Sequence, residues 1–303
     1  MKRVRFTMFA LGAVLSAVIA GRADSQSSFE DALAQYNAET VRGYVQPLVD
    51  LFGANLNAGF FFGPAAPKNK LTFGLSLIGM ASPIADKYRT YIANTPPGWS
   101  PETFETATIF GGQGTTVTNA NNPLLQYRGS DGLIDASFLP LASPQLSVGG
   151  IAGTEAVFRY GKTPTLGDNK EIPSATLFAI GARHNIGRYL GILPIDLGLG
   201  VMYSSFKVGD IVNVTGVTIG FQGSKTFTVL TAYGTLAWEK TTMNLTYTST
   251  DPGASGSVDV DINGANKFRT NFGALLRLGV VRVFADLNVG SVMNYSGGLS
   301  FGL

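Results

Sequence analysis

The chain contains no cysteine and only one histidine among its 303 residues. The lack of cysteine excludes a disulfide framework, and it also excludes anchoring as a lipoprotein through an N-terminal cysteine. A single histidine without a neighbouring carboxylate does not make a metal site, and we expect no cofactor. Basic residues do not cluster beyond the first few positions and the net charge is +2, so we expect no nucleic-acid partner.

Charged residues are scarce and long apolar runs are missing. Charged residues make up 14% of the chain, against about 25% in typical proteins. After the N-terminal region no apolar run reaches the roughly 18 residues of a membrane-spanning helix. Glycine and aromatic residues are abundant instead, with 38 Gly, 20 Phe and 11 Tyr. This combination is typical of a membrane β-barrel, whose outer surface faces lipid.

The first residues have the pattern of a secretory signal peptide. A positively charged start over residues 1–5 precedes an apolar stretch over residues 6–19. The stretch is too short for a comfortable spanning helix, and cleavage after Ala20 fits the small-residue rule. We therefore predict a signal peptide over residues 1–20, with an uncleaved N-terminal helix as the alternative.

From residue 57 onward apolar and polar residues alternate with a period of two, which is the period of a β-strand. Several strands reach about ten residues, the length that crosses a bilayer at a tilt. Inside lipid only helices and closed barrels satisfy their backbone groups. We predict an all-β fold, a closed antiparallel transmembrane β-barrel of about 12–14 strands over residues 57–303. Within it, residues 83–144 form a long irregular loop region. A soluble β-sandwich is the alternative.

The alternation is clearest after Ser224, and its apolar rows are expected to face the lipid. These apolar rows comprise Phe227, Val229, Thr231 and Tyr233; Met243, Leu245 and Tyr247; Phe268, Phe272, Leu276 and Leu278; and Val281, Val283, Leu287 and Val289. At the other end of the predicted barrel, residues 59–62 are predicted to form the first strand.

Residues 21–56 differ from the rest because their apolar residues have helical spacing. A second helical stretch is predicted near Tyr44, with Pro47 in its first turn and Gly53 as its stop. The segment is too polar to span a bilayer. We expect it to plug or cap one end of the barrel, or to lie at the membrane interface.

Charged side chains opposite the apolar rows should point into the lumen, because a charge on the lipid face costs about 2–4 kcal/mol near the midplane. In the lumen they would either set solute selectivity or cross-link the wall as structural ion pairs. These residues are Glu155, Arg159, Arg183, Asp196, Arg269, Arg277, Arg282 and Asp286.

His184, at the end of a predicted strand, is a candidate rim site that would bind a ligand or respond to pH. Its structural alternative is a hydrogen bond that anchors a loop.

Asp259, Asp261 and Asn263 match the start of a calcium loop. The twelfth position is Thr270 instead of Glu, and the same residues alternate like a strand edge. No credible Ser-His-Asp set is present, so we do not expect an enzyme.

The last strand, from Tyr295 to Leu303, carries its apolar residues on one face. Outer-membrane barrels commonly end on such a strand with a terminal aromatic residue, which the barrel-assembly machinery reads. Here the last residue is Leu303, and Phe301 stands two residues before it.

Four segments occur in order that are similar to the signatures of a bacterial family. They are GYVQPLVDLFGANLNAG from Gly43, LPLASPQLSVGG from Leu139, GTEAVFRY from Gly153 and GARHNIGRY from Gly181. The chain resembles an uncharacterised, Bacteroidetes-type family of outer-membrane β-barrel proteins, a domain of unknown function. The resemblance implies a barrel and no activity. The layout is also loosely similar to long-chain fatty-acid transporters, where N-terminal helices plug a barrel; fold alone does not fix function.

These observations favour a protein of the bacterial outer membrane, in contact with its lipid and exported through a cleaved signal peptide. The expected function is passive passage or uptake of a small solute, with an apolar solute as one option. The alternatives are a structural or adhesive surface barrel with a filled lumen, and a soluble periplasmic β-protein.

Overall fold

The computed structural model describes residues 38–65, 70–164, 174–191, 193–248 and 257–302. The predicted signal peptide lies outside these residues. Among the described residues, the helix α3 (Ala38–Asn57) precedes the strands. The strands, with two short 3-10 helices η1 and η2, are β1 (Thr72–Pro83), η1 (Asp86–Tyr88), β2 (Thr90–Asn94), β3 (Thr103–Ala107), β4 (Thr116–Asn119), β5 (Asn122–Arg128), β6 (Phe138–Ile151), β7 (Thr154–Lys162), β8 (Ala175–Asn185), η2 (Ile186–Tyr189), β9 (Asp196–Val208), β10 (Val212–Phe227), β11 (Leu230–Thr248), β12 (Ser257–Asn263), β13 (Phe268–Leu278), β14 (Val281–Gly290) and β15 (Asn294–Gly302).

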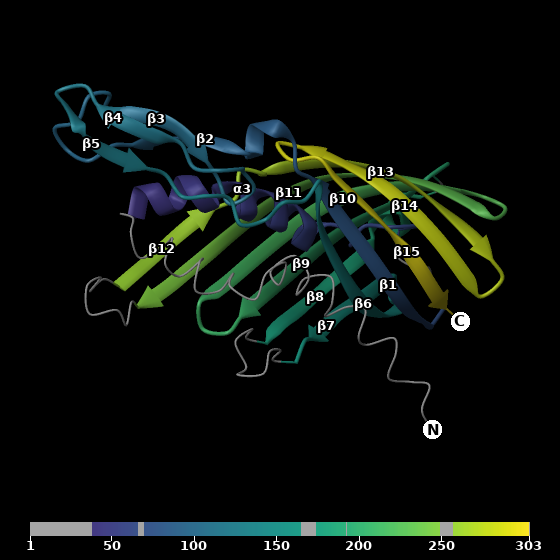
Figure 1. The fold of residues 1–303 in the computed structure, drawn as a ribbon. Helices are drawn as coiled ribbons and strands as arrows, with labels where there is room; N and C mark the ends of the chain where they lie inside the picture. The colour runs from purple at the N-terminus through teal and green to yellow at the C-terminus, as the bar shows by residue number, and fades with distance from the viewer. Residues whose placement is uncertain (1–37, 66–69, 165–173, 192, 249–256, 303) are drawn as a thin grey trace.

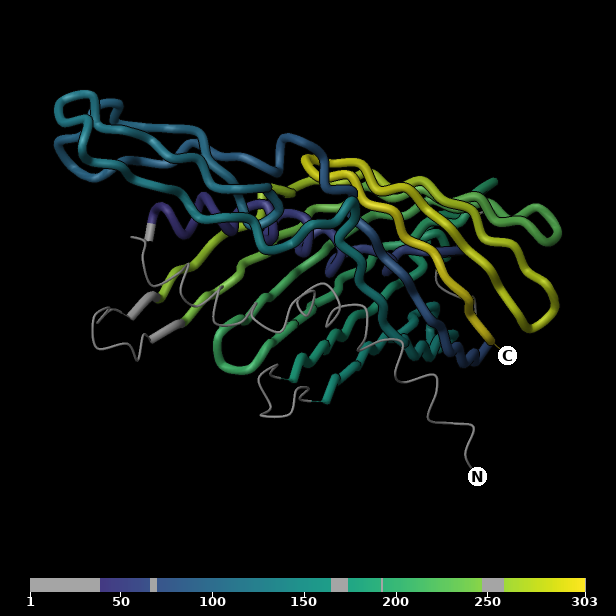
Figure 2. The backbone as a smooth tube through the Cα atoms, viewed as in Figure 1, coloured from purple at the N-terminus to yellow at the C-terminus, as the bar shows by residue number. Residues whose placement is uncertain are grey.

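The described strands form a closed antiparallel barrel (Figure 1). Its ring has ten strands, in the order β1, β6, β7, β8, β9, β10, β11, β13, β14 and β15, and β15 pairs with β1. The last and first strands therefore lie side by side (Figure 2). β11 is long enough to pair with β13 along its first half and with β12 along its second half. Closure leaves no free edge along the ring, which is the condition for a sheet to stand in lipid.

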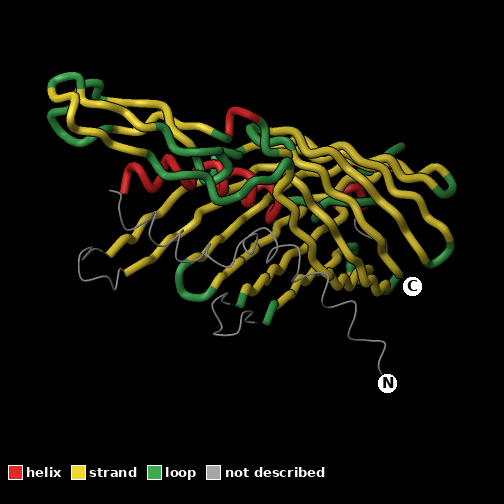
Figure 3. Tube along the Cα trace, viewed as in Figure 1, coloured by secondary structure: helices red, strands yellow, loops and turns green. Residues whose placement is uncertain are grey.

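The barrel is confirmed, but its ring has fewer strands than the 12–14 expected. The irregular region forms two separate two-stranded sheets, β2 with β3 and β4 with β5, which stand outside the ring. Figures 1 and 3 show this extension projecting from one end of the barrel. The stretch expected as the first strand, residues 59–62, is not a strand. It continues from α3 as an irregular, buried segment inside the barrel.

Along most of the ring, apolar side chains face outward and polar side chains face inward. On β1, Phe73, Leu75 and Leu77 are exposed while Ser76 is buried. On β14, Val283 is exposed while Asn288 is buried. This order is the reverse of a soluble protein and matches the alternation of a membrane barrel. The residues that follow the expected pattern on β13 are Phe268, Phe272, Leu276 and Leu278, all exposed.

One of the expected lipid-facing rows points the other way, and so does part of a second row, whose Phe227 and Val229 are exposed as expected. Met243 and Leu245 on β11 are buried inside, and so are Thr231 and Tyr233 on the same strand. Met243 and Leu245 pack with α3 and β12 in one apolar cluster, so this part of the strand faces a protein core instead of lipid. The side chain of Tyr247 lies outside the described residues.

α3 lies inside the barrel and is one continuous helix, with Pro47 in its interior instead of in its first turn. Proline removes one backbone donor and crowds the carbonyl of the residue four positions earlier, which here is Gly43. The side of Gly43 is covered by the ring of Tyr91, so closely that a Cβ there would lie 2.4 Å from it. No helix among the described residues has the length and hydropathy to cross a membrane.

The two ends of the barrel differ. At the end where β1 begins and β15 stops, the connections are residues 152–153, 186–195, 228–229 and 279–280. The connection from β1 to β6, which carries the β2–β5 extension, lies at the other end. α3 starts at this extension end, where the Tyr44 carbonyl accepts a hydrogen bond of 3.1 Å from the Ile109 N–H. We call the first end the short-turn end and the second the extension end.

Candidate functional site

The interior of the barrel is occupied by α3 and by residues 58–65. We call these two segments together the plug. It runs from the extension end toward the short-turn end, where the Ala65 N–H donates to Ser224 Oγ at 3.0 Å. The plug is bound to the wall by side chains from many strands, and these contacts form the candidate site.

The C-terminus of α3 is capped by two arginines of the wall. The last carbonyls of a helix have no partner within the helix and carry partial negative charge. Arg269 donates to the Asn57 carbonyl at 2.7 Å. Arg159 donates to the carbonyls of Ala58, at 3.0 Å, and Gly59, while its Nε donates to Gln145 at 2.8 Å. Two guanidinium groups thus take the place of further helix at the point where α3 ends.

A third arginine holds the segment after the helix. Arg183 donates to the Phe62 carbonyl at 2.9 Å and forms a buried ion pair with Glu155, whose Oε2 accepts from both Nε and Nη2 of the arginine. Gln222 donates to the Gly63 carbonyl at 2.8 Å. An arginine offers five donors in a fixed fork, so one side chain binds the plug and a wall carboxylate together.

The second buried ion pair joins Arg269 to Glu239, with 3.4 Å between Nη1 and Oε2. Glu239 also accepts a hydrogen bond from Asn266. Burying an isolated charge is costly, and breaking a buried pair leaves the remaining charge uncompensated. The pairs Arg183–Glu155 and Arg269–Glu239 therefore keep the guanidinium groups neutralised while they bind plug carbonyls.

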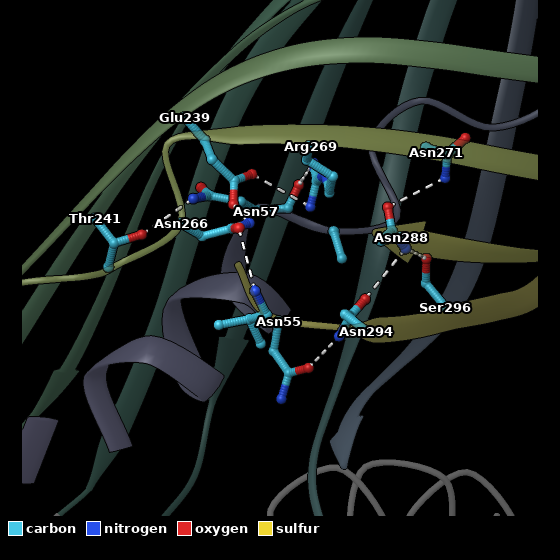
Figure 4. A network of polar contacts seen from close by, with 12 residues as sticks. Asn55, Asn57, Glu239, Thr241, Asn266, Arg269, Asn271, Asn288, Asn294 and Ser296 are labelled. Atoms are coloured by element: carbon cyan, nitrogen blue, oxygen red, sulfur yellow. Dashed lines mark hydrogen bonds and ion pairs between the residues drawn. The ribbon is translucent and has the colours of Figure 1, made fainter. Parts of the chain in front are cut away.

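Asparagines link the end of α3 to the wall in a chain of hydrogen bonds (Figure 4). Asn57 donates to Thr241 at 3.1 Å, and Asn55 donates to the Leu139 carbonyl at 2.7 Å. Asn55 accepts in turn from Asn294 on β15. The chain continues from Asn294 to Asn288, which also contacts Asn271, Asp286 and Ser296. The network spans β13, β14 and β15 and ends on the plug.

Near the extension end, α3 binds the wall where β12 gives way to β13. Asp50 accepts hydrogen bonds of 2.8 Å from the Ala265 N–H and of 2.8 Å from Gln46, and Gln46 also donates to the Asn263 carbonyl at 2.9 Å. Burial raises the pKa of the Asp50 carboxyl above its usual value, and the two hydrogen bonds oppose that rise. The helix thus supplies hydrogen-bond partners for backbone groups at the end of β12 and in the connection to β13.

The apolar part of the plug fits against glycines of the wall. Phe60, Phe61 and Phe62 are buried inside the barrel. A Cβ on Gly200 or on Gly220 would lie 2.7 Å from the Phe61 ring. These two positions accept the ring only because they have no side chain. Phe62 stacks on Phe284 with a centroid distance of 4.1 Å.

The structure places the eight charged residues named from the sequence on the inner face of the wall, where they divide into three groups. Arg159, Arg183 and Arg269 bind the plug, Glu155 pairs with Arg183, and Asp286 accepts from Tyr233 at 3.1 Å. Asp196 is half-buried at the short-turn end. Arg277 and Arg282 lie together on β13 and β14, and neither is bound to the plug.

The remaining candidates lie on the outer face. His184 contacts Thr154 Oγ1 at 2.8 Å and the Tyr189 hydroxyl at 3.0 Å, so it ties two turns together at the short-turn end. Asp259, Asp261 and Asn263 stand on the outward face of β12, where Asn244 donates to both carboxylates. An extended strand cannot wrap these oxygens around one ion, and no group of metal-binding side chains is found in the described part of the chain.

Glu239, Gln145, Asn55 and Asn57 were not identified from the sequence. Glu239 could have been found, because it lies on the same face of β11 as Thr231 and Thr235, and a carboxylate on that face is evidence that the face meets the lumen instead of lipid. The asparagines carried no such signal, since polar residues at the end of a helix are equally common facing water.

The barrel is similar to solved outer-membrane barrels. The outer membrane protease OmpT from Escherichia coli matches with 9% identity and a TM-score of 0.33, over 79% of this chain and 98% of that chain. The translocator domain of the autotransporter NalP from Neisseria meningitidis matches with 12% identity and a TM-score of 0.24, over 95% and 99%. These values are low, so the fold assignment rests on the hydrogen-bonded ring itself.

No relative is found among curated proteins. The sequence profile of one family, described as a family of unknown function (DUF6588), matches residues 1–303. This match covers the whole chain and confirms the expected membership of a family without an assigned activity. The protein belongs to the DUF6588 family.

Proposed function

We propose that this protein is an outer-membrane β-barrel whose lumen is closed by its own N-terminal segment, and that it serves as a surface barrel instead of an open pore. The observation that carries the proposal is the set of three buried arginines, Arg159, Arg183 and Arg269, which all donate to backbone carbonyls of the plug. A barrel built for free passage has a water-filled polar interior. Here the polar side chains of the wall are used to hold protein.

The outer face supports the membrane location. Exposed apolar side chains surround the ring, and they include Leu75 on β1, Ile180 on β8, Leu236 on β11 and Leu299 on β15. Tyr203, Trp238 and Tyr295 also face outward, as aromatic residues of an interfacial girdle do. A soluble β-protein would pair this surface with a second layer, and the described residues place no layer outside the ring.

The asymmetry of the ends supports an orientation. Outer-membrane barrels have short turns on the periplasmic side and longer loops outside the cell. By this rule the short-turn end faces the periplasm, and the β2–β5 extension is presented at the cell surface. The exposed side chains of Ile92 and Leu124 on the extension would then meet the extracellular medium or a surface partner.

Planar-bilayer conductance of the purified full-length protein tests the closed lumen. We expect the wild type to stay closed, because the plug is hydrogen-bonded to the wall. The variant Arg159→Gln/Arg183→Gln/Arg269→Gln should give frequent openings, since it loses the charged donors to four plug carbonyls. Arg188→Gln, on the outer rim, is the matched control and should stay closed.

Heat-modifiable migration in a detergent gel shows that each variant still forms a barrel. A large, steady conductance of the wild type would sink the proposal of a closed lumen. Recovery of the protein only in the soluble extract, without heat-modifiable migration, would sink the membrane location.

A second candidate function is gated passage of a small solute past the plug. It is favoured by three buried wall hydroxyls, those of Ser204, Thr218 and Thr235, which have no hydrogen-bond partner in the described structure. Such groups are commonly satisfied by water or ligand. They lie on β9, β10 and β11, strands on which neighbouring residues contact Asn57 and Phe61.

A reversible lock separates the two candidates. The chain has no native cysteine, so Asn57→Cys with Thr241→Cys introduces one defined pair at the contact between α3 and β11. For gated passage, solute-driven liposome swelling should stop on oxidation and return on reduction. If swelling is absent in both states, the barrel is closed and gated passage is wrong.

A further inference from the structure

Two arginines stand directly opposite each other on the inner face of the short-turn end. Arg277 on β13 and Arg282 on β14 are cross-strand partners in the hairpin that turns at Gly279. Each lies two residues from a buried inward residue, Leu275 on β13 and Phe284 on β14, so both side chains belong to the lumen side of the wall. Like charges placed directly opposite each other on a sheet destabilise it, so this pair calls for a compensating anion.

Neither arginine has a carboxylate partner among the described residues. The described ion pairs of the wall join Glu155 to Arg183 and Glu239 to Arg269. The carboxylate that attracts Arg282 electrostatically is that of Glu155, but its Oε2 already accepts two hydrogen bonds from Arg183. The Nε of Arg282 is buried and has no hydrogen-bond partner in the described structure.

The row of residues beside Arg282 supplies hydroxyl groups. Ser300 on β15 is the cross-strand partner of Arg282, and Ser76 on β1 is the partner of Ser300. Both serines are buried, and the Oγ of Ser76 has no hydrogen-bond partner in the described structure. Adjacent strands are about 4.8 Å apart, so Arg282 and Ser76 are separated by roughly 10 Å of wall. An arginine side chain and one tetrahedral anion together cover that span.

The backbone around the row leaves room for the guanidinium. Gly302 on β15 lies against Arg282, and a Cβ there would be 2.9 Å from Nη2 of the arginine. Gly302 pairs with Gly74 on β1, so two glycines occupy the inner face at the mouth. Arg277, Arg282, Ser300 and Ser76 thus form a row of donors that opens to solvent on the side of Arg277, which is exposed.

We propose that this row binds a phosphate group at the short-turn mouth of the barrel, carried by inorganic phosphate, by a phosphorylated solute or by a lipid headgroup. Arginine forks match the oxygen spacing of phosphate and form charge-assisted hydrogen bonds with it. The serine hydroxyls donate to the remaining oxygens. A bound dianion would neutralise both arginines and satisfy Nε of Arg282 and Oγ of Ser76. This site goes beyond the proposed function, because it requires only the barrel wall.

The probe is inorganic phosphate added to the full-length protein folded in a non-ionic detergent, with chloride at equal ionic strength as the reference. A ligand that binds only the folded state raises the unfolding midpoint, which loss of heat-resistant gel migration reports. We expect phosphate to raise the midpoint of the wild type more than chloride does. Arg282→Gln should weaken the apparent phosphate affinity at least tenfold, and Arg277→Gln should do the same.

The matched control is Arg188→Gln, because Arg188 lies at the same end of the barrel but on its outer rim, over the Tyr189 ring. Its phosphate response should equal that of the wild type. Arg277→Gln also removes the like-charge opposition, so its midpoint without phosphate should be at or above that of the wild type. If Arg282→Gln does not fold, Ser76→Ala serves in its place and should weaken the response to phosphate.

A second arm replaces phosphate by mixed micelles that contain phosphatidylglycerol. Stabilisation in either arm that is lost in Arg282→Gln supports the site, and the arm that works identifies the source of the phosphate group. The proposal is overturned if chloride stabilises the wild type as strongly as both probes, or if Arg282→Gln responds as the wild type does.

Discussion

The two halves of β11 have opposite polarity although they belong to one strand. From Leu230 to Trp238, exposed apolar side chains alternate with inward residues such as Thr231 and Thr235. Beyond Lys240 the order reverses: Thr242 and Asn244 point outward, while Met243 and Leu245 are buried against α3 and β12. The reversal occurs between Trp238 and Thr242.

The difference shows that the period of two fixes which residues share a face, and that the surroundings fix which face is apolar. In the first half the outside is the proposed bilayer and the inside is polar. In the second half the outside is the proposed aqueous phase and the inside is a packed core. Trp238 and Lys240 on the outer face mark the boundary, since an aromatic ring and then a charge suit the membrane interface.

The largest effect is expected from a charge placed inside the second half. Leu245→Asp buries a carboxylate in the apolar cluster of Met243, Val260 and α3. An uncompensated buried charge costs about 3–5 kcal/mol, so the extension end should open first. Limited proteolysis within β12 of the folded protein measures this opening. Leu245→Met is the control and should leave β12 as protected as in the wild type; equal protection of the Asp variant would contradict the buried core.

The next effect is expected from a charge on the outside of the first half. Leu236→Arg places a guanidinium on the exposed apolar face and should lower the free energy of unfolding by about 2–4 kcal/mol if that face meets lipid. Equilibrium unfolding in urea from phospholipid vesicles gives the value. Thr242→Arg, on the same face of the same strand beyond Lys240, should change it by about 0.5 kcal/mol or less. Equal costs at the two positions would remove the proposed boundary.

A smaller effect is expected where the wall meets the plug. Gly220→Val would force the Phe61 ring away from β10, since even a Cβ would lie 2.7 Å from it. Overpacking of this kind costs about 1–3 kcal/mol. Gly79→Val is the control, because a Cβ there meets only the Gly297 carbonyl oxygen, at 3.8 Å. Thermal unfolding of the two variants should differ, and an unchanged midpoint for Gly220→Val would mean that the plug is not packed there.

The alternation of β13 and β14 was enough to predict their faces, because each strand stays in one environment along its length. The same rule was wrong for Met243 and Leu245. Their neighbours on α3 are almost two hundred residues away in the sequence, and nothing local reveals them. The strand count was overestimated because short alternating stretches in residues 83–144 pair with each other instead of joining the ring.

For the site, the sequence could place charges opposite apolar rows, but it could not show what they bind. The partners of Arg159 and Arg269 are backbone carbonyls at the end of a helix. Every residue has such a carbonyl, so no side-chain pattern marks the ones left without partners. Only the position of α3 in the lumen does so.

The pairing of β1 with β15 has a consequence for biogenesis. The ring is sealed by the pairing of β1 with β15, so sealing requires β15 to be in place. The plug directly precedes β1 and is therefore present throughout the time in which the seam is open. The inward arginines can find their carbonyl partners during closure, and the barrel need never pass through a state in which it is empty and is filled afterwards.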